Sequence, residues 1–389
     1  MANYISSNNN RFYVAVEDNF GHAQAIDGTN RLPAVALHAH QQLSQTVRRD
    51  KTGTRSFWGS SPLSRRATAF SVSTYLASWN GADWPGYGPL LQSVCGSKAA
   101  LFAQTAVVQM TDPIHLVTAT PHGLNRGSGL SQGSEVRFVS SVVDELTIRL
   151  NAPFSADPAP ASLLAPCLTY SLGNTLPSVT LFDYWDPLTA VHRVITGATA
   201  DYLTISLNGD FHEMTFAGLG ANLIDSESFV AGTAGLQSFP DEPALTSFDY
   251  SVVGGHLGEA WLGVTAQQVF TLTQASIQIK NNLVARSMEF GFIYPTSFAA
   301  GPRDVSISFS LFVDDSATVK ALYAAAKTRT PISVMFQLGQ QQGQLMGIYL
   351  PAVQLEMPAY DDREPRLIWD FKANIAQGAN NDEIFIAVA

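Results

Sequence analysis

Residues 301–313 read Gly-Pro-Arg-Asp-Val-Ser-Ile-Ser-Phe-Ser-Leu-Phe-Val, and this stretch indicates the fold because an earlier part of the chain carries the same pattern. The apolar residues from Val305 to Leu311 alternate with serines, which is the period of a β-strand with one buried face. A helix is expected directly afterwards, from about residue 316 to 327. The last third of the chain is therefore predicted to contain a strand followed by a helix.

The earlier copy lies in the first hundred residues. There a turn-rich stretch ending in Arg66 precedes the alternating segment 69–76, and a short helix is expected near 88–95. Each copy also has a comparable strand upstream, at 35–43 and at 275–283. Such self-similarity indicates two related modules in one chain.

The helix of the late copy is the best defined one. It has apolar residues at the spacing of one helical face, namely Val319, Leu322, Tyr323 and Ala326. Asp314, Asp315 and Ser316 precede it as capping candidates. We expect this face to pack on a sheet, with one helix laid against a sheet or barrel in each module.

The overall composition agrees with a large β-rich protein. A length of 389 residues exceeds a core of ordinary size, and 29 glycines and 20 prolines favour many short strands and turns. The polar start and the lack of a long apolar run predict neither a signal peptide nor a membrane span. Cys95 and Cys167 are expected to be small buried apolar residues, without a disulfide or a zinc site.

The division expected from these patterns has a split first module and an intact second one. It assigns 1–104 and 176–232 to the first module, 105–175 to an inserted small β domain, 233–247 to a linker and 248–389 to the second module. Three strands are expected in the insertion, which lacks a counterpart in the late copy. The predicted fold class is mainly β, with sandwich or barrel modules that each carry one helix.

Four segments of the second module resemble the major tail tube proteins of long-tailed, siphovirus-like bacteriophages. They are 273–283, 301–311, 348–355 and 382–387. The resemblance covers about 245–389 well and the first copy more loosely. It implies two fused tail-tube modules whose inner strands line a continuous β-tube. It also implies that rings of these modules stack through a long loop and that DNA passes through the lumen.

The resemblance also implies the setting of the protein. A two-module chain would form a homotrimeric, pseudo-hexameric ring in the virion tail after synthesis in the host bacterial cytoplasm. Its partners would be further copies of itself, the tape measure protein, the tail terminator and distal tail proteins, and viral DNA bound without sequence specificity. A net charge of −10 with only 14% charged residues opposes general DNA affinity, so an acidic and neutral polar lumen is expected.

A basic loop in the first module is the main candidate contact site. Its residues are Arg48, Arg49, Lys51, Arg55, Phe57 and Trp58, with Arg65 and Arg66 nearby. The composition fits a nucleic-acid patch, a solvated hairpin or an arm that contacts an acidic neighbouring ring. Arg and Trp are typical interface anchors, so we favour the inter-ring arm.

No catalytic or cofactor site is expected. His38 and His40 have a spacing compatible with metal binding but no evident third ligand. The acidic pairs at 314–315, 361–362 and 382–383 are interpreted as a helix start, a turn and a solvated terminus. Residues 254–258 are glycine-rich but lack the Lys-Ser/Thr of a phosphate loop.

An alternative function is a carbohydrate-binding or adhesin-like β-sandwich protein of the virion. It would use exposed aromatic residues such as Trp79, Trp84 and Trp261. An end-on view of tubes or rings would separate the two functions.

Overall fold

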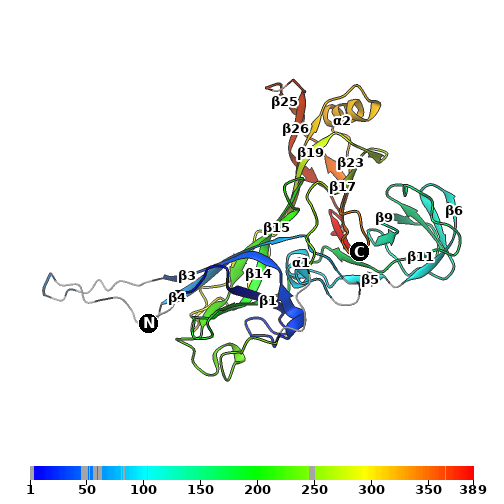
Figure 1. The fold of residues 1–389 in the computed structure, drawn as a ribbon. Helices are drawn as coiled ribbons and strands as arrows, with labels where there is room; N and C mark the ends of the chain where they lie inside the picture. Colours follow the sequence, from blue (N-terminus) through cyan, green and yellow to red (C-terminus); the bar gives the residue numbers. More distant parts are fainter. Residues whose placement is uncertain are drawn as a thin grey trace.

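The computed structural model describes residues 4–44, 51, 53–55, 59, 64–79, 81, 84–102, 104–244, 250–363 and 365–389. Within these ranges, hydrogen bonding joins nineteen strands into one connected sheet that folds back on itself, and a second, six-stranded sheet lies beside it (Figure 1). The mainly β fold class predicted from the sequence is confirmed.

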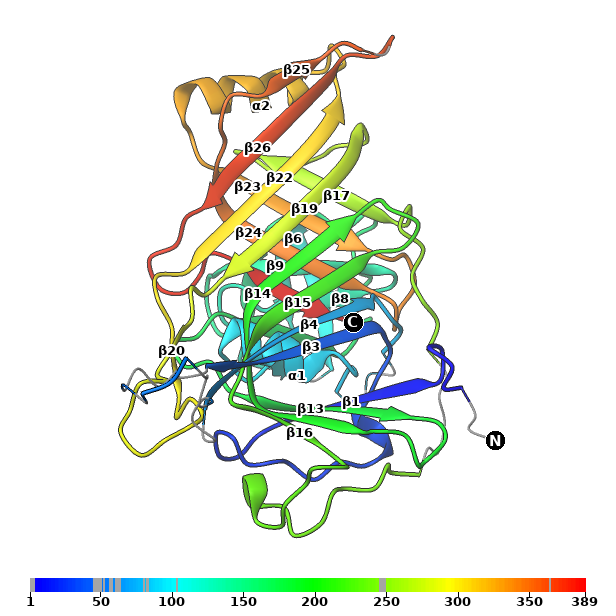
Figure 2. The ribbon, with the colours of Figure 1, turned by 90° about the vertical axis from the view of Figure 1, so that its left-hand side faces the viewer.

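The largest part of the connected sheet, which we call the curved sheet, is an antiparallel run of eight strands. In spatial order these are β3 (Ala34–Ser44), β4 (Arg65–Tyr75), β15 (Glu213–Gly220), β14 (Arg193–Leu207), β19 (Leu272–Lys280), β22 (Asp304–Phe312), β26 (Ile368–Ala376) and β25 (Ala359–Asp361). Figure 2 shows the strands running diagonally across the face that is turned to the viewer.

Alternating side chains give the curved sheet its two faces. In β22, Val305, Ile307 and Phe309 are buried while Ser306 and Ser308 between them are partly exposed. The same alternation in the other strands places the apolar residues in the main core. Burying one apolar face of each strand is the main stabilising contribution of this part of the fold.

Two smaller groups of strands cover the apolar face. The first contains β1 (Asn10–Val16), β2 (Arg31–Leu32), β13 (Val179–Trp185), the first part of β14, and β16 (Asn222–Asp225). The second has the order β18 (Gln267–Gln268), β17 (Gly258–Gly263), β23 (Ile332–Leu338), β24 (Met346–Gln354), β27 (Phe385–Val388), β12 (Cys167–Ser171) and β5 (Ala100–Phe102). β14 therefore belongs to both layers.

Two α-helices, α1 (Gly88–Cys95) and α2 (Ala317–Thr328), add to the buried side. The hydroxyl oxygen of Ser316 caps α2 by accepting a hydrogen bond from Val319 N over 3.2 Å. The short 3-10 helices η1 (Gly28–Asn30) and η2 (Thr233–Gly235) lie in loops, and β20 (Val284–Ala285) pairs with β21 (Phe298–Ala299) in a small hairpin.

The six-stranded sheet, which we call the side sheet, is built from one continuous stretch of chain. Its strands are β6 (Thr105–Asp112), β7 (His115–Thr118), β8 (Gly129–Gln132), β9 (Glu135–Val142), β10 (Thr147–Leu150) and β11 (Leu163–Leu164). The sequence predicted β7, β9 and β10 but not β6, β8 or β11. β6 buries only Val107 and β11 has two residues, so neither shows an alternating period. β12 follows in sequence but pairs with β5 and β27 of the connected sheet.

The side sheet lies behind the curved sheet when the polar face of the curved sheet is viewed, as Figures 1 and 2 both show. Phe138 of β9 packs on Tyr349 of β24, with ring centroids 5.3 Å apart. Arg137 is fully buried at the same junction, where its Nη2 lies 2.7 Å from a carboxylate oxygen of Glu135. The side sheet is thus fixed to the second covering group by packing and by a buried cation.

The segment expected to link the two modules, 233–247, contacts the first strand of the chain. Glu242 accepts hydrogen bonds from Arg11 at 2.6 and 2.7 Å and from the Tyr13 hydroxyl at 3.0 Å. Part of the expected linker at 233–247 is therefore held by side-chain contacts, and residues 245–249 lie outside the described ranges.

Candidate assembly surface

The uncovered face of the curved sheet is dominated by small neutral polar side chains. Cross-strand pairing aligns Ser73, Thr215, Thr204, Gln278 and Ser306 in one row over five adjacent strands. Ser71, Ser206, Ser276 and Ser308 extend the same character to neighbouring rows. Such a surface offers hydrogen bonds to water but few fixed charges.

The charged side chains on this face have both signs. Lys280 lies opposite Asp304 on the neighbouring strand, and Lys372 Nζ is 3.7 Å from an Asp370 carboxylate oxygen. Glu213 is exposed at the start of β15. The expected neutral polar character is therefore accompanied by lysines as well as by acidic residues.

β3 and β25 are the two outermost strands of the curved sheet. Within the described ranges, β3 pairs only with β4, and β25 pairs only with β26. Val35 and Leu43 of β3 and Tyr360 of β25 are exposed. Unpaired edges with exposed apolar residues are places where another strand adds to a sheet.

An exposed apolar cluster lies in the loop between β19 and β22. Phe290 is 100% exposed and Met288 is 80% exposed, with Phe292 close to them in sequence. The loop is attached to β4, where Arg66 N donates to Ile293 O over 2.8 Å and Arg65 Nη1 donates to Ser287 O over 3.1 Å. No strand or helix period marks this cluster in the sequence, although Met-Glu-Phe-Gly-Phe at 288–292 is an unusually apolar loop.

The predicted basic contact loop is described only in part. Lys51 and Arg55 are exposed, whereas Arg48, Arg49, Phe57 and Trp58 lie outside the described residues. The basic loop and the loop carrying Phe290 connect corresponding strand pairs, β3 to β4 and β19 to β22.

The predicted helix residues lie in α2. Val319, Leu322 and Ala326 are buried in the main core, and Tyr323 is half-buried with its ring centroid 5.3 Å from that of Trp369. Among the preceding residues, Asp314 accepts from Ser316 N over 3.0 Å, so its carboxylate takes part in the helix start.

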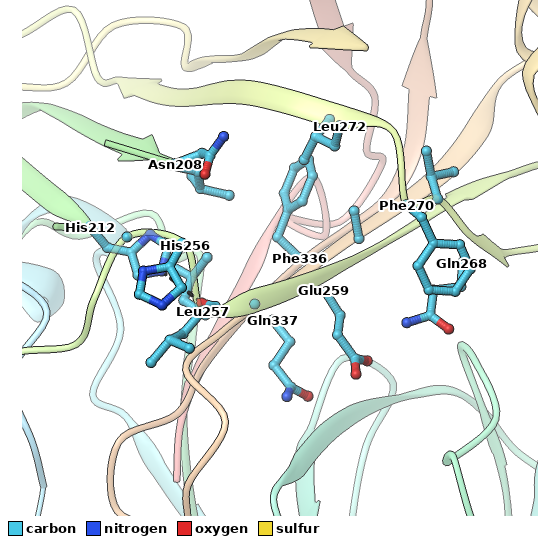
Figure 3. Close-up of a pocket in the computed structure, with 16 residues that line it drawn as sticks. Asn208, His212, His256, Leu257, Glu259, Gln268, Phe270, Leu272, Phe336 and Gln337 are labelled. Carbon is cyan, nitrogen blue, oxygen red and sulfur yellow. Dashed lines mark hydrogen bonds between the residues drawn. The ribbon is translucent and has the colours of Figure 1, made fainter. Parts of the chain in front are cut away.

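A pocket lies between the β14–β15 turn and strands β17 and β23 (Figure 3). The Nε2 of His212 donates to Leu257 O over 2.9 Å, and the side-chain amide of Gln337 donates to Ser134 O over 3.0 Å. Burial lowers the pKa of His212. Both side chains therefore hold backbone segments that surround the pocket.

The other candidate groups are distributed without a shared centre. His38 and His40 are exposed on β3. Across the described part of the chain, no three His, Cys, Asp or Glu side chains are placed to hold a metal ion. Cys95 and Cys167 are buried, as predicted, and burial raises the pKa of each thiol to about 12.

The three tryptophans named for the carbohydrate-binding alternative do not share an exposed surface. Trp79 and Trp261 are buried, and the Trp261 ring lies 5.0 Å from the guanidinium carbon of Arg137. Trp84 is exposed. The carbohydrate-binding alternative requires exposed aromatic residues. The expectation of exposure is therefore wrong for Trp79 and Trp261.

Comparison with known proteins identifies the family of the chain. No helix in the described ranges has the length and apolarity to cross a membrane. No curated protein matches the chain. A family model described as phage tail tube protein matches residues 8–387. Because this match spans nearly the whole chain, the protein belongs to the phage tail tube protein family.

Proposed function

We propose that three copies of this chain form a ring, that rings stack into the phage tail tube, and that DNA passes along the polar face of the curved sheet. Membership of the family gives the chain a structural role in the virion tail and self-assembly into a tube. The ring of three, the stacking contacts and the passage of DNA are the proposal.

The observation that supports the ring most directly is the eight-stranded curved sheet with an available strand at each edge. Four strands come from 34–220 and four from 272–376, in agreement with two fused modules. Three chains of eight strands would close a barrel of 24 strands and remove every free edge. Barrels of about 16 to 18 strands already enclose a water-filled channel.

The orientation follows from the polar face. Small Ser, Thr and Gln side chains bind a phosphate backbone weakly because they release no counterions. The side sheet is on the opposite side of the curved sheet, so the proposed ring carries it on the outside of the tube (Figure 1). In this arrangement the side sheet, as an inserted domain, leaves the channel clear.

Ring stacking is assigned to the two loops at one end of the curved sheet. The loop at 281–303 contributes the apolar cluster around Phe290, and the basic loop contributes Lys51 and Arg55 together with the remaining residues predicted from the sequence. Aromatic anchors and arginines are both typical of specific protein interfaces.

Electron microscopy of the purified protein tests the function. Tubes whose end-on averages show three chains with pseudo-sixfold symmetry are expected. Monomers that form neither rings nor tubes over a wide range of concentration and salt would contradict the assembly role, and six chains in each ring would contradict the trimer.

A further inference from the structure

The curved sheet contains an internal joint between its two halves. The first half has the order β3, β4, β15, β14 and the second has the order β19, β22, β26, β25. The last strand of the first half, β14, pairs with the first strand of the second, β19. The two outermost strands of the curved sheet are β3, the first strand of the first half, and β25, the last strand of the second half in this spatial order.

The first hairpin of each half has the same irregularity in its pairing. In β3 and β4 the register shifts between Ala34, opposite Thr74, and Ala36, opposite Ser73. In β19 and β22 it shifts between Leu272, opposite Leu311, and Gln274, opposite Ser310. A residue of β3 therefore corresponds to the residue 238 positions later in β19.

The second hairpin of each half can be aligned as closely. Thr204 lies opposite Thr215 and Ser206 opposite Glu213 in the first half. Ala359 lies opposite Asp370 and Asp361 opposite Ile368 in the second half. All four second-half residues lie 155 positions after their counterparts, so the two hairpins have the same length between these pairs.

The alignments of the first and second hairpins are consistent with each other where the two hairpins pair in the core. Phe216 lies opposite Val72, and Phe371 lies opposite Phe309. Phe371 lies 155 positions after Phe216, as in the second hairpin. Val72 and Phe309 hold matching places in the first hairpin, because their partners Leu37 and Ala275 are 238 positions apart. Both phenylalanines are fully buried.

We infer that β25 of one chain pairs antiparallel with β3 of a second copy in the register that β14 and β19 have within the chain. The internal pairs are Thr204 with Gln278, Ile205 with Ile277 and Ser206 with Ser276. The corresponding pairs between chains are Ala359 with His40, Tyr360 with Ala39 and Asp361 with His38. This inference rests on the proposed function and specifies the contact between neighbouring chains.

The side chains at the free edges fit this register. In the internal joint, Ile205 and Ile277 lie opposite each other on paired strands, and both are buried. Tyr360 is 58% exposed, and its ring meets Trp369 edge to face with centroids 5.9 Å apart. A large Tyr360 opposite a small Ala39 fills the space that two isoleucines fill in the internal joint.

The polar face of the same contact brings a carboxylate and an imidazole together. Asp361 would lie opposite His38, with His40 two residues further along the same strand. In the single chain, Arg363 Nε donates to the Asp361 carboxylate over 2.8 Å, and His38 and His40 are exposed. A carboxylate directly across from an imidazole supports antiparallel pairing in this register. A shift of one strand by one residue would place the two side chains on opposite faces of the sheet.

Paired cysteines test the register. The variant with Ala359→Cys and His40→Cys places two thiols directly opposite each other between chains, at a separation that a disulfide spans. The variant with Thr204→Cys and Gln278→Cys is the matched internal control, because it occupies the equivalent pair within one chain. The variant with Ala359→Cys and Gln42→Cys is a register control displaced by two residues. Cys95 and Cys167 are buried and are left in place.

Assembled protein is oxidised with copper phenanthroline and separated on a non-reducing denaturing gel. Covalent species of up to three chains are expected from the first variant, internally linked single chains from the second and unlinked chains from the third. As a second measurement, mixing the single variants Ala359→Cys and His40→Cys should give covalent dimers, while either variant alone should give none.

Cross-linking in the displaced variant, or none in the first variant and in the mixture, would overturn the register. If tubes are still seen by electron microscopy in that case, the proposed function stands and only the inference is lost. Absence of rings and tubes from the unmodified protein would instead contradict the proposed function.

Discussion

The guanidinium of Arg137 lies over the ring of Trp261, with its carbon 5.0 Å from the ring centroid, although the two residues belong to different sheets. Arg137 Nε also donates to Pro153 O over 2.7 Å, and Glu135 lies within ion-pair distance. A buried cation is stable only when its donors have partners and opposite charge is close. This contact is therefore a main attachment of the side sheet.

Replacing Arg137 by alanine is expected to destabilise the protein by about 3 kcal/mol, because it leaves Glu135 without its buried partner and opens space beside Trp261. Arg149→Ala is the matched control, since Arg149 is exposed on β10 of the same sheet. Denaturant unfolding followed by tryptophan fluorescence measures both. Equal midpoints for the two variants would contradict the attachment role.

The stability of the pocket region is expected to fall in mild acid. Burial lowers the pKa of His212, and His256 is the neighbouring charge that lowers it further, while the hydrogen bond to Leu257 O raises it. The unfolded chain titrates near 6.5, so the unfolded state takes up the proton first and the folded state loses stability as pH falls through that window. Above about pH 6.5 this contribution is fully present.

His212→Gln should flatten the change in unfolding midpoint between pH 7.5 and pH 5.5, because the amide keeps a donor near Leu257 O and does not titrate. His22→Gln is the control, since His22 is exposed and lies outside the proposed contacts. An unchanged pH dependence in His212→Gln would show that His212 is not the titrating group.

Phe290→Asp should prevent rings from stacking and leave the chain folded, because a charge at the fully exposed tip cannot be buried in an apolar contact. Val143→Asp, at an exposed turn of the side sheet, serves as the control and should form normal tubes. Tube length is read from electron micrographs. Tubes of normal length from Phe290→Asp would exclude the loop as a stacking contact.

Reversing the basic loop tests the second stacking element. Arg48, Arg49 and Lys51 changed together to glutamate should shorten tubes most strongly at low salt, where charge contacts are least screened. Unaltered tubes under those conditions would remove the basic loop from the stacking contact.

The polar face of the curved sheet should not retain DNA. Purified tubes are expected to bind duplex DNA weakly at physiological salt, and Ser73→Arg with Ser276→Arg should create salt-sensitive binding because arginines displace counterions from phosphates. Ser141→Arg, on β9 of the side sheet, is the control. Tight binding by the unmodified tubes would contradict a lumen that lets DNA slide.

Local features of this fold could be predicted from the sequence. The strand of β22, the helix α2 and its Ser316 cap follow from alternation, from helical spacing and from capping chemistry within about a dozen neighbouring residues. Asn208-Gly209 between two alternating segments is a hairpin signal in the sequence, but the strands stop at Leu207 and Glu213, so the loop is longer than a two-residue hairpin turn.

Contacts between distant segments could not be predicted in the same way. β12 lies between β5 and β27, although Phe385–Val388 is at the far end of the chain from Ala100–Phe102. The register of β14 against β19 likewise depends on the shape of both halves. The buried position of Trp261 follows from the packing of Arg137 on it, which its neighbours in sequence do not encode.

β14 passes from the first covering group into the curved sheet without a break, and its second part forms a ladder of six residue pairs with β19. Separating the two halves of the chain would therefore break this ladder and expose both layers of the first half to water. The chain should unfold as one cooperative unit and act as a stiff element in the tail. Bending of the tube would then take place mainly between rings, because neighbouring chains within a ring would be joined by paired strands.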